Sequence, residues 1–512
     1  MFDKLLNIPA HRFLHFMGCA ILAFGLPMNK VLMSIGTIWL AANVLLAGDF
    51  KKYKENLKKS TIFWFIILIF GFHVAGILWS EDLGYAFRDM RSKLPFFAIP
   101  LALIAMPLAK EFWKYVIYIF IFSLLITTII NILNLYFLSG SEALNDYRKL
   151  SLFGSHIRYG ILVVFGAMIA LIFSFRFNRW SVLWFLIFLW FTYYTLIAQV
   201  FSAYIAYGFT FIGLTILALT KIKHTSIKYF SILLLILSVT SLSWVSITYI
   251  TSIPNIPFDE LETHTAKGNI YNHHDLPVTE NENIVMIYLN EGEISGQWRN
   301  VSDIPYGDTA VNGVPIKVAL IRYMTSLGLR KDAADFKKLS TQDIKEIERG
   351  ATCIKDRNQL MARMEALRNQ LVLYNKGKSP DGSSLLQRVE HWKTASHIIK
   401  SNWLYGVGTG DVQNVFDKKY KSLNSPLSKK HWYRSHNQFL TFFVSFGVFG
   451  FILFLMLWGF VFKKVLQTKN WIGFAFALVA FASFLPEDTL ETQQGVTFVG
   501  FFLGFLPFLK LR

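Results

Sequence analysis

Long apolar runs separated by short polar and basic loops dominate the chain. Each run is close to the roughly 20 residues that a helix needs to cross the hydrocarbon core of a bilayer, or slightly shorter. The pattern predicts twelve membrane-spanning helices. They lie at about 13–27, 31–48, 61–79, 94–109, 115–138, 157–175, 182–197, 201–220, 229–250, 437–462, 471–485 and 494–510.

One long polar interval interrupts this pattern. It divides the chain into an N-terminal transmembrane region of about nine spans (1–250), a polar segment (251–436) and a C-terminal transmembrane region of about three spans (437–512). The first half of the polar segment mixes Pro, Gly and Asn with short apolar runs, which indicates turns and short strands. The second half has apolar residues at helical spacing. We therefore expect an all-α polytopic membrane protein with one large, mostly helical soluble segment.

Composition supports a membrane protein and excludes several functions. Of 512 residues, 54% are hydrophobic, only 16% are charged, and 49 are Phe; soluble proteins of this length do not carry so much apolar surface. The net charge of +18 comes mainly from short clusters between apolar runs, which favours membrane lipids over nucleic acid as partners. Cys19 and Cys353 offer neither a plausible disulfide nor metal-ligand spacing. We expect no metal and no cofactor.

The basic residues also predict orientation. With both termini on one side, the short loops on that side hold nearly three times as many Lys and Arg residues as the opposite loops. Because basic loops tend to stay in the cytoplasm, this predicts cytoplasmic termini. It also places 251–436 on the outer side of the membrane; in a two-membrane bacterium this side is the periplasm, and the spans lie in the inner membrane.

Several arginines in the predicted outer loops oppose this bias. Arg158 lies at the start of a span, where a charge facing hydrocarbon costs on the order of a few kcal/mol. Arg88 and Arg91 share a helical face just before another span. Each of these three could anchor the chain at the interface or bind an anion in a polar cavity. Arg388 lies four residues before Trp392 on a predicted helix. The alternative to a functional role is that its side chain is simply solvated or salt-bridged.

The segment 434–438 brings a cation, an imidazole and two amides to the mouth of the span at 437–462. An imidazole titrates near neutrality and can accept a proton from a hydroxyl. This makes His436 the strongest catalytic candidate, although a lone His is more often structural. Asn437 and the outer carboxylates Glu487 and Asp488 are candidates for orienting an acceptor, with balancing of the arginines as the alternative.

A glycine-rich run, Gly406-Val407-Gly408-Thr409-Gly410-Asp411, follows the predicted helix at 384–401. The βαβ context of a nucleotide-binding fingerprint is missing. The run predicts a tight turn, and its alternative is a phosphate bound by the amides at the start of the next helix. Outward-facing arginines together with one His suit a lipid diphosphate, because Arg binds phosphate bidentately and the substrate brings its own leaving group.

These features together resemble the O-antigen ligase and O-antigen polymerase superfamily. One match is His436-Asn437-Gln438-Phe439-Leu440 followed by Phe446-Gly447-Val448-Phe449-Gly450. A second is Arg388-Val389-Glu390-His391-Trp392-Lys393-Thr394-Ala395 leading into the glycine-rich run. The third is the layout of about a dozen spans with one large polar segment before the His motif. The stretches 327–333 and 485–491 are similar to the version found in Bacteroidetes.

The resemblance implies a metal-independent, inverting glycosyltransferase that works on the periplasmic face. Its donor would be a glycan on undecaprenyl diphosphate, and its acceptor would be lipid A–core or another glycan. By the family's pattern, Arg388 would hold the diphosphate and His436 would deprotonate the acceptor hydroxyl. From position and charge we add Arg158, Arg434 and the Arg88/Arg91 pair to the expected donor site.

One departure from the family concerns a cation. Many members carry an Arg at the outer end of a span in the middle of the chain, where this sequence reads Ala198-Gln199-Val200-Phe201-Ser202. We expect that Arg158 or the Arg88/Arg91 pair replaces it, unless this branch handles the diphosphate differently.

We favour O-antigen ligation over two alternatives with the same motifs, an O-antigen polymerase and a protein O-oligosaccharyltransferase. The product lost on deletion would separate the three. A lipid or polysaccharide transporter belongs to a different class. It would require charges deep in several spans and matching broken helices in two halves, which the sequence does not show.

Overall fold

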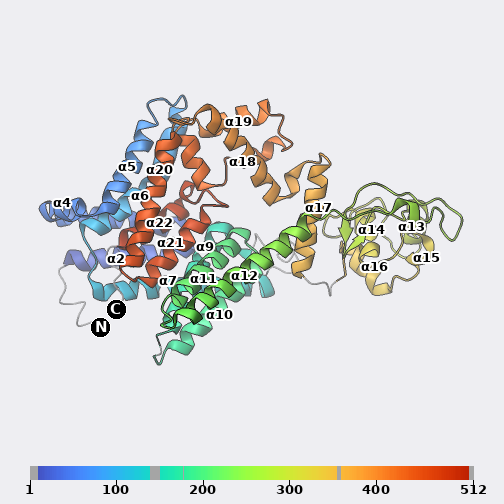
Figure 1. Ribbon diagram of the computed structural model, residues 1–512, viewed down its shortest axis with the longest axis horizontal. Coiled ribbons are helices and arrows are strands. Elements are labelled where there is room, and N and C mark those ends of the chain that lie inside the picture. The colour runs from blue at the N-terminus through green and yellow to red at the C-terminus, as the bar shows by residue number, and fades with distance from the viewer. Residues whose placement is uncertain (1–9, 139–149, 177, 355–358, 507–512) are drawn as a thin grey trace. The chain divides into compact units, whose positions relative to one another are not determined.

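The structure is a computed structural model that describes residues 10–138, 150–176, 178–354 and 359–506 (Figure 1). It divides into two compact units. The first unit contains the described residues up to Lys228, Arg388–Ser425 and the described residues from Trp432 onward. The second unit contains Tyr229–Gln387 and Pro426–His431. The stretches Arg388–Ser425 and 432–436, from the predicted polar segment, thus group with the spans.

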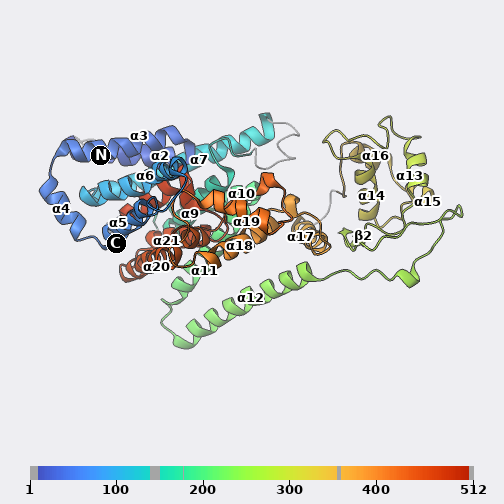
Figure 2. The same ribbon diagram turned by 90° about the horizontal axis from the view of Figure 1, so that it is seen from above.

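Helices build almost all of the first unit, which confirms the predicted all-α membrane fold. They are α2 (Ala10–Met28), α3 (Lys30–Ala47), α4 (Phe50–Lys58), α5 (Thr61–Ala75), α6 (Leu83–Ala105), α7 (Lys110–Leu133, continued by a π-helical turn, Asn134–Leu138), α9 (His156–Ser174), α10 (Ser181–Ala198), α11 (Phe201–Leu219), α18 (Ser384–Ser401), α19 (Val412–Ser422), α20 (Gln438–Gln467), α21 (Trp471–Ser483) and α22 (Gln493–Phe505). Figure 2 shows α2 and α3 as a helical hairpin.

A helix lies over the described part of each of the twelve predicted runs, and the end of the last run, 507–510, is outside the described residues. Not all of these helices can cross a membrane alone. Among the described residues, seven helices are long and apolar enough, or eight if α4 and α5, bent by 89°, form one span. The helices over four of the other runs, α2, α6, α21 and α22, are shorter or more polar. Helix α6 is the instructive case, because it begins at Leu83 and so includes the cations that sequence analysis assigned to a loop.

Close packing of α22 against α6 joins two parts of the chain that hold charged residues. A Cβ atom at Gly500 would lie 3.1 Å from the carbonyl oxygen of Pro95, and one at Gly504 would lie 2.9 Å from the Cα of Pro100. Both glycines therefore allow the two backbones to approach more closely than larger side chains would permit. This contact brings the connection before α22, including a short 3-10 helix at Thr489–Glu491, to the polar half of α6.

Helix α20 is broken at Gly447, where φ is 62° and ψ is −159°. This region of backbone conformation is open essentially to glycine alone. The break leaves backbone groups without their partners in the helix, and inside a membrane such groups need other partners. The segment 403–408 supplies them: Val407 N donates to Val444 O at 2.8 Å, and Val448 N donates to Trp403 O, also at 2.8 Å.

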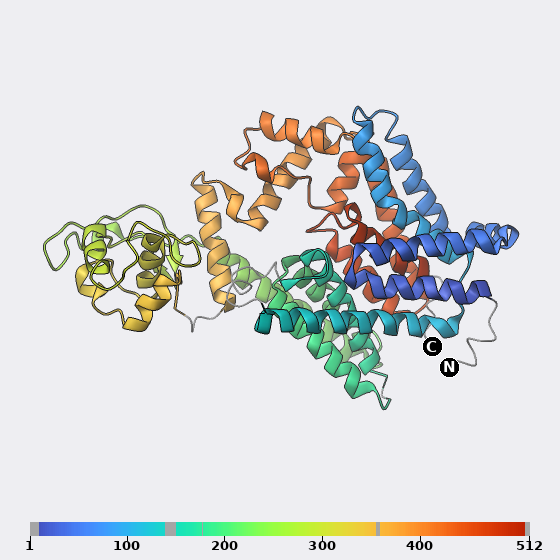
Figure 3. The same ribbon diagram turned by 180° about the vertical axis from the view of Figure 1, so that it is seen from behind.

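The same segment continues to the end of α5. Thr409 Oγ1 donates to His73 O at 2.7 Å, and Gly410 N donates to Ser80 Oγ at 2.8 Å. The carboxylate of Asp411 then accepts the amides of Glu81 and Asp82 at 2.8 and 3.0 Å. We call residues 403–411 the clasp, because they tie α18 and α19 to the end of α5 and to the break in α20. Figure 3 shows these elements at one end of the first unit.

The second unit contains α12 (Thr225–Thr251, which begins in the first unit) and a small domain. Its helices are α13 (Glu291–Trp298), α14 (Ile316–Ser326), α15 (Ala333–Phe336), α16 (Thr341–Glu348) and α17 (Gln359–Asn375), with 3-10 turns at Phe258–Glu260, Pro380–Gly382 and Lys429–His431. The predicted short strands are one antiparallel pair, β1 (Thr279–Glu280) and β2 (Asn283–Ile284), in which Thr279 pairs with Ile284. Trp298, Leu320 and Met324 lie in its fully buried core.

The break in α20 generates a stability prediction. A Cβ atom at Gly447 would lie 2.2 Å from the carbonyl oxygen of Leu404, whereas one at Gly459 on the same helix meets nothing within 4 Å. Gly447→Ala should therefore lower the free energy of unfolding by about 2–4 kcal/mol, and Gly459→Ala should leave it nearly unchanged. Unfolding of both variants in detergent measures the difference, and equal stabilities would contradict the role given to the break.

Candidate active site

Three carboxylates with buried side chains lie in the connection between α21 and α22: Glu487, Asp488 and Glu491. A buried carboxylate is costly unless cations or hydrogen-bond donors satisfy it. Each of the three meets partners from helices that are distant in sequence. This connection is therefore the point at which the charged groups of the first unit converge.

Two arginines form ion pairs with Glu487. Arg388 from α18 places Nη2 2.5 Å from Oε1, and its Nε donates to the carbonyl oxygen of Pro486 at 2.9 Å. Arg158 at the start of α9 places Nη1 3.0 Å from Oε2. The hydroxyl of Ser202 on α11 donates to Oε1 at 3.1 Å. Two guanidinium groups thus face one small region, and the Nε of Arg158 is buried without a hydrogen-bond partner among the described residues.

His436 lies beside this group. Its Nδ1 is 3.9 Å from Oε2 of Glu487 and is buried, while the side chain as a whole is 33% exposed. The exposed part of the ring is therefore on the edge away from the carboxylate. The ring also packs near His391 and Tyr433, at centroid distances of 5.3 and 5.8 Å.

The backbone at His436 is strained. Its φ is 46°, a left-handed conformation that costs a non-glycine residue about 1–3 kcal/mol. Contacts on both sides hold it in place. Ser435 Oγ lies 2.8 Å from the hydroxyl of Thr441 and 3.4 Å from Asp488, and the Asn437 side chain caps α20 by accepting the Leu440 amide at 3.1 Å. Strain of this kind, fixed by its surroundings, often marks a functional residue.

The electrostatic surroundings of His436 favour a neutral ring. Burial lowers the pKa of the imidazole, the carboxylates of Asp488 and Glu487 oppose this, and the guanidinium groups of Arg388 and Arg158 lower it further. The net pKa is below the usual value near 6.5. At neutral pH the ring is therefore unprotonated and able to accept a proton.

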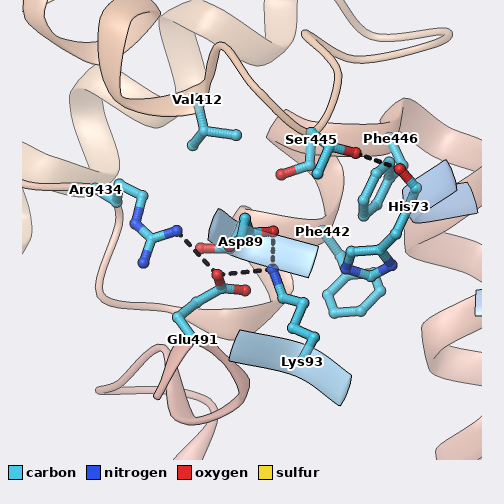
Figure 4. Close-up of a pocket in the computed structure, with 11 residues that line it drawn as sticks. His73, Asp89, Lys93, Val412, Arg434, Phe442, Ser445, Phe446 and Glu491 are labelled. Atoms are coloured by element: carbon cyan, nitrogen blue, oxygen red, sulfur yellow. Dashed lines mark hydrogen bonds and ion pairs between the residues drawn. The ribbon is translucent and has the colours of Figure 1, made fainter. Parts of the chain in front are cut away.

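A second charged group surrounds Glu491 (Figure 4). Its Oε2 lies 2.9 Å from Lys93 Nζ on α6 and 2.9 Å from Arg434 Nη1. Lys93 also pairs with Asp89, one helical turn earlier, at 2.5 Å. Burial alone would raise the pKa of the Glu491 carboxyl, but Lys93 and Arg434 overcome that effect and hold its pKa well below the usual value. The carboxylate is thus ionised at any physiological pH.

The cavity beside this second group is very small. It has a volume of about 10 Å³ and is bordered by Asp89, Lys93, Arg434 and Glu491 together with His73, three hydroxyl side chains and three apolar ones. That is space for roughly one water molecule and not for a diphosphate. Arg434, expected from sequence to bind the donor, points with Nη1 toward Glu491 at this closed site (Figure 4).

The remaining predicted cations lie elsewhere. Arg88 and Arg91 are exposed on α6, and neither makes an ion pair with a described residue. Arg88 lies 5.9 Å from the ring centre of Tyr85. Sequence analysis did not assign a role to Lys93 in the site, although its spacing of four residues from Asp89 is a helical ion-pair signal. It also missed Ser202, which no local pattern distinguishes.

The contacts of the clasp agree with a structural turn for the glycine-rich run. The amides of Val407 and Gly408 donate to Val444 O and Ser445 O, so protein oxygens already satisfy them. A Cβ atom at Gly406, Gly408 or Gly410 would lie 2.4–2.7 Å from neighbouring atoms. The glycines are therefore required by close approach to α20 and to the end of α5. The phosphate alternative concerns the amides at the start of α19 (Val412–Ser422) and stays a prediction.

Fold and site together define a polytopic helical membrane protein in which arginines, carboxylates and the His436 imidazole lie close together. A family model described as O-Antigen ligase matches residues 346–455, the range that contains Arg388, the clasp and His436. This match confirms the resemblance to the O-antigen ligase superfamily, and it supports a membrane enzyme of the ligase or polymerase type that transfers glycans. No curated protein matches the chain.

The ion pairs of Glu487 generate a second stability prediction. Glu487→Ala removes the shared partner of two buried arginines, and breaking a buried pair in this way typically costs about 3–5 kcal/mol. Glu81→Ala, which removes an exposed carboxylate of the same unit, should change stability by less than about 0.5 kcal/mol. Unfolding in detergent compares the two, and a Glu487→Ala protein as stable as the parent would contradict the assigned pairing.

Proposed function

We propose that the protein transfers a glycan from undecaprenyl diphosphate to an acceptor hydroxyl at the periplasmic face of a bacterial inner membrane. The observation that carries the proposal is the meeting of Arg158, Arg388 and His436 around Glu487. These groups come from three separate parts of the chain. Two are cations that suit phosphate oxygens and one is an imidazole able to accept a proton.

The proposed reaction assigns each group one task. The acceptor oxygen attacks the anomeric carbon of the donor sugar, its proton passes to the exposed edge of His436, and the bond from carbon to diphosphate oxygen breaks with inversion. Arg158 and Arg388 stabilise the negative charge that develops on the departing diphosphate. Glu487, beside Nδ1, stabilises the imidazolium that forms. Every atom is balanced without a metal or a further reactant.

The environment of Glu487 favours Arg158 as the replacement for the family arginine that this chain lacks. Ser202, three residues after Gln199, donates its hydroxyl to Glu487, so this part of the chain does reach the site. It contributes a hydroxyl in place of a cation, and Arg158 contributes the cation beside it. Arg88 and Arg91 have no such contact.

The residues expected to orient the acceptor are themselves engaged. Asn437 caps α20, and Asp488 accepts a hydrogen bond from Thr441 at 2.8 Å. We propose that both support the turn that carries His436. For the acceptor we favour lipid A–core, in keeping with the Bacteroidetes-like stretches of the sequence. Deletion in the native host distinguishes ligation, which would lose capped lipopolysaccharide, from polymerisation, which would lose only long chains.

The direct test is transfer by the purified protein in lipid nanodiscs. With an undecaprenyl diphosphate-linked glycan and lipid A–core, we expect product without ATP and no effect of EDTA. Failure with every glycan acceptor, or a strict requirement for ATP, would contradict the proposal and favour a transporter.

His436 carries two linked predictions. His436→Ala should reduce transfer by roughly 100- to 10,000-fold, the range for loss of a general base, with donor binding preserved. In the parent enzyme, kcat/KM should be level at neutral pH and should fall about tenfold per pH unit below the pKa of His436, which lies under 6.5. Initial rates from pH 4.5 to 8 measure this; an activity that rises on acidification would exclude His436 as the base.

The arginines make different predictions. Arg158→Ala and Arg388→Ala should each raise the donor KM about tenfold or more, because each loses charge-assisted hydrogen bonds to phosphate. Arg388→Lys should recover little, since an ammonium cannot bind bidentately. Arg88→Ala and Arg91→Ala serve as matched controls with near-parental kinetics. A larger effect in these controls than in Arg158→Ala would move the missing cation to α6.

A further inference from the structure

Glu491 connects both ends of the turn that carries His436. Arg434, two residues before the histidine, donates from Nη1 to Oε2 at 2.9 Å. Gln438, two residues after it, donates from Nε2 to Oε1 at 3.2 Å. One carboxylate thus holds the first and last residues of the five-residue turn, with the strained His436 at its centre.

Further contacts fix this arrangement. The side-chain oxygen of Gln438 accepts a hydrogen bond from the backbone amide of Leu490 at 2.7 Å. The backbone amide of Gln438 donates to Phe484 O at 2.9 Å. Lys93 on α6 balances the charge of Glu491, with its Nζ 2.9 Å from Oε2. The side chain of Glu491 is 3% exposed, so water offers little competition for these bonds. The turn is therefore tied to the connection between α21 and α22 at both of its ends.

The donor-binding cations are held separately. Arg158 and Arg388 contact Glu487, and Arg434 borders the small closed cavity beside Glu491. A change at Glu491 can therefore alter the position of the imidazole while leaving the two guanidinium groups in place. The effect of a Glu491 variant on kcat can therefore be measured separately from its effect on the donor KM.

We propose that Glu491 is a positioning residue, which holds the 434–438 turn so that His436 stays in its left-handed conformation beside Glu487. The inference rests on the proposed function, in which His436 is the base. It assigns Arg434 to the support of that base and not to the diphosphate.

Two charge-balanced double variants test this. Glu491→Gln/Lys93→Met removes one anion and one cation and breaks the tie, because the amide group of Gln cannot accept from both Arg434 and Gln438. Asp89→Asn/Lys93→Met removes the same charges from the same buried group and keeps Glu491 on the turn. We expect kcat to fall 10- to 100-fold in the first variant with donor KM within threefold, and to stay within threefold of the parent in the second.

A second readout needs no activity. Diethyl pyrocarbonate modifies neutral imidazoles, and peptide mass spectrometry gives the rate at His436 in the full-length protein without substrate. We expect at least a threefold faster modification in the Glu491→Gln/Lys93→Met variant and no change in the control. Equal rates and equal kcat values in the two variants would overturn the positioning role. If His436 is modified faster in the Glu491→Gln/Lys93→Met variant but the parent protein shows no transfer, the proposed function alone would be overturned.

A third pair keeps the test decisive if a double variant fails to fold. Arg434→Met cuts one end of the tie, and Arg434→Lys can still pair with Glu491. The positioning role predicts a 10-fold or larger loss of kcat for Met and recovery to within threefold for Lys. A donor KM that rises tenfold in Arg434→Met with kcat unchanged would return Arg434 to the diphosphate site and overturn the inference.

Discussion

A carboxylate buried at the end of a helical bundle cannot remain ionised without cations, and this constraint organises the first unit. Glu487 is fully buried and is satisfied by Arg158, Arg388 and Ser202, which come from α9, α18 and α11. The same bonds that satisfy the charge therefore bring distant segments together. The site is a consequence of that requirement, because the guanidinium groups and His436 meet where the carboxylate lies.

The backbone follows the same rule. The break at Gly447 leaves amide and carbonyl groups that lipid cannot satisfy, and the clasp pairs with them through Val407 N and Trp403 O. Since the clasp directly follows α18, satisfying the broken helix also fixes the end of the helix that carries Arg388. Burial of charge and burial of backbone thus act together to place one arginine. In an enzyme that relies on electrostatic stabilisation, such prior placement of donors is the main contribution that a protein can make.

Much of this arrangement could be predicted from sequence, and the failures have physical reasons. Length and apolar content predicted the runs over which the structure has helices, and the residues singled out at Arg388 and His436 lie near each other beside Glu487. The polar half of α6 was not predicted as part of this helix, because the sequence did not show that the helix starts at Leu83. Because the helix starts there, Lys93 lies one turn from Asp89 and faces Glu491. Arg88 and Arg91 are exposed. Ser202 and the clasp depend on contacts between distant segments, which no local spacing reveals.

The most direct measurement is an experimental structure of the protein in nanodiscs with undecaprenyl diphosphate bound. The account predicts phosphate oxygens within hydrogen-bonding distance of both Arg158 and Arg388, with the open edge of the His436 ring facing the terminal phosphate, where the sugar would be attached. A diphosphate bound at the opposite end of the helices, or away from both arginines, would contradict it.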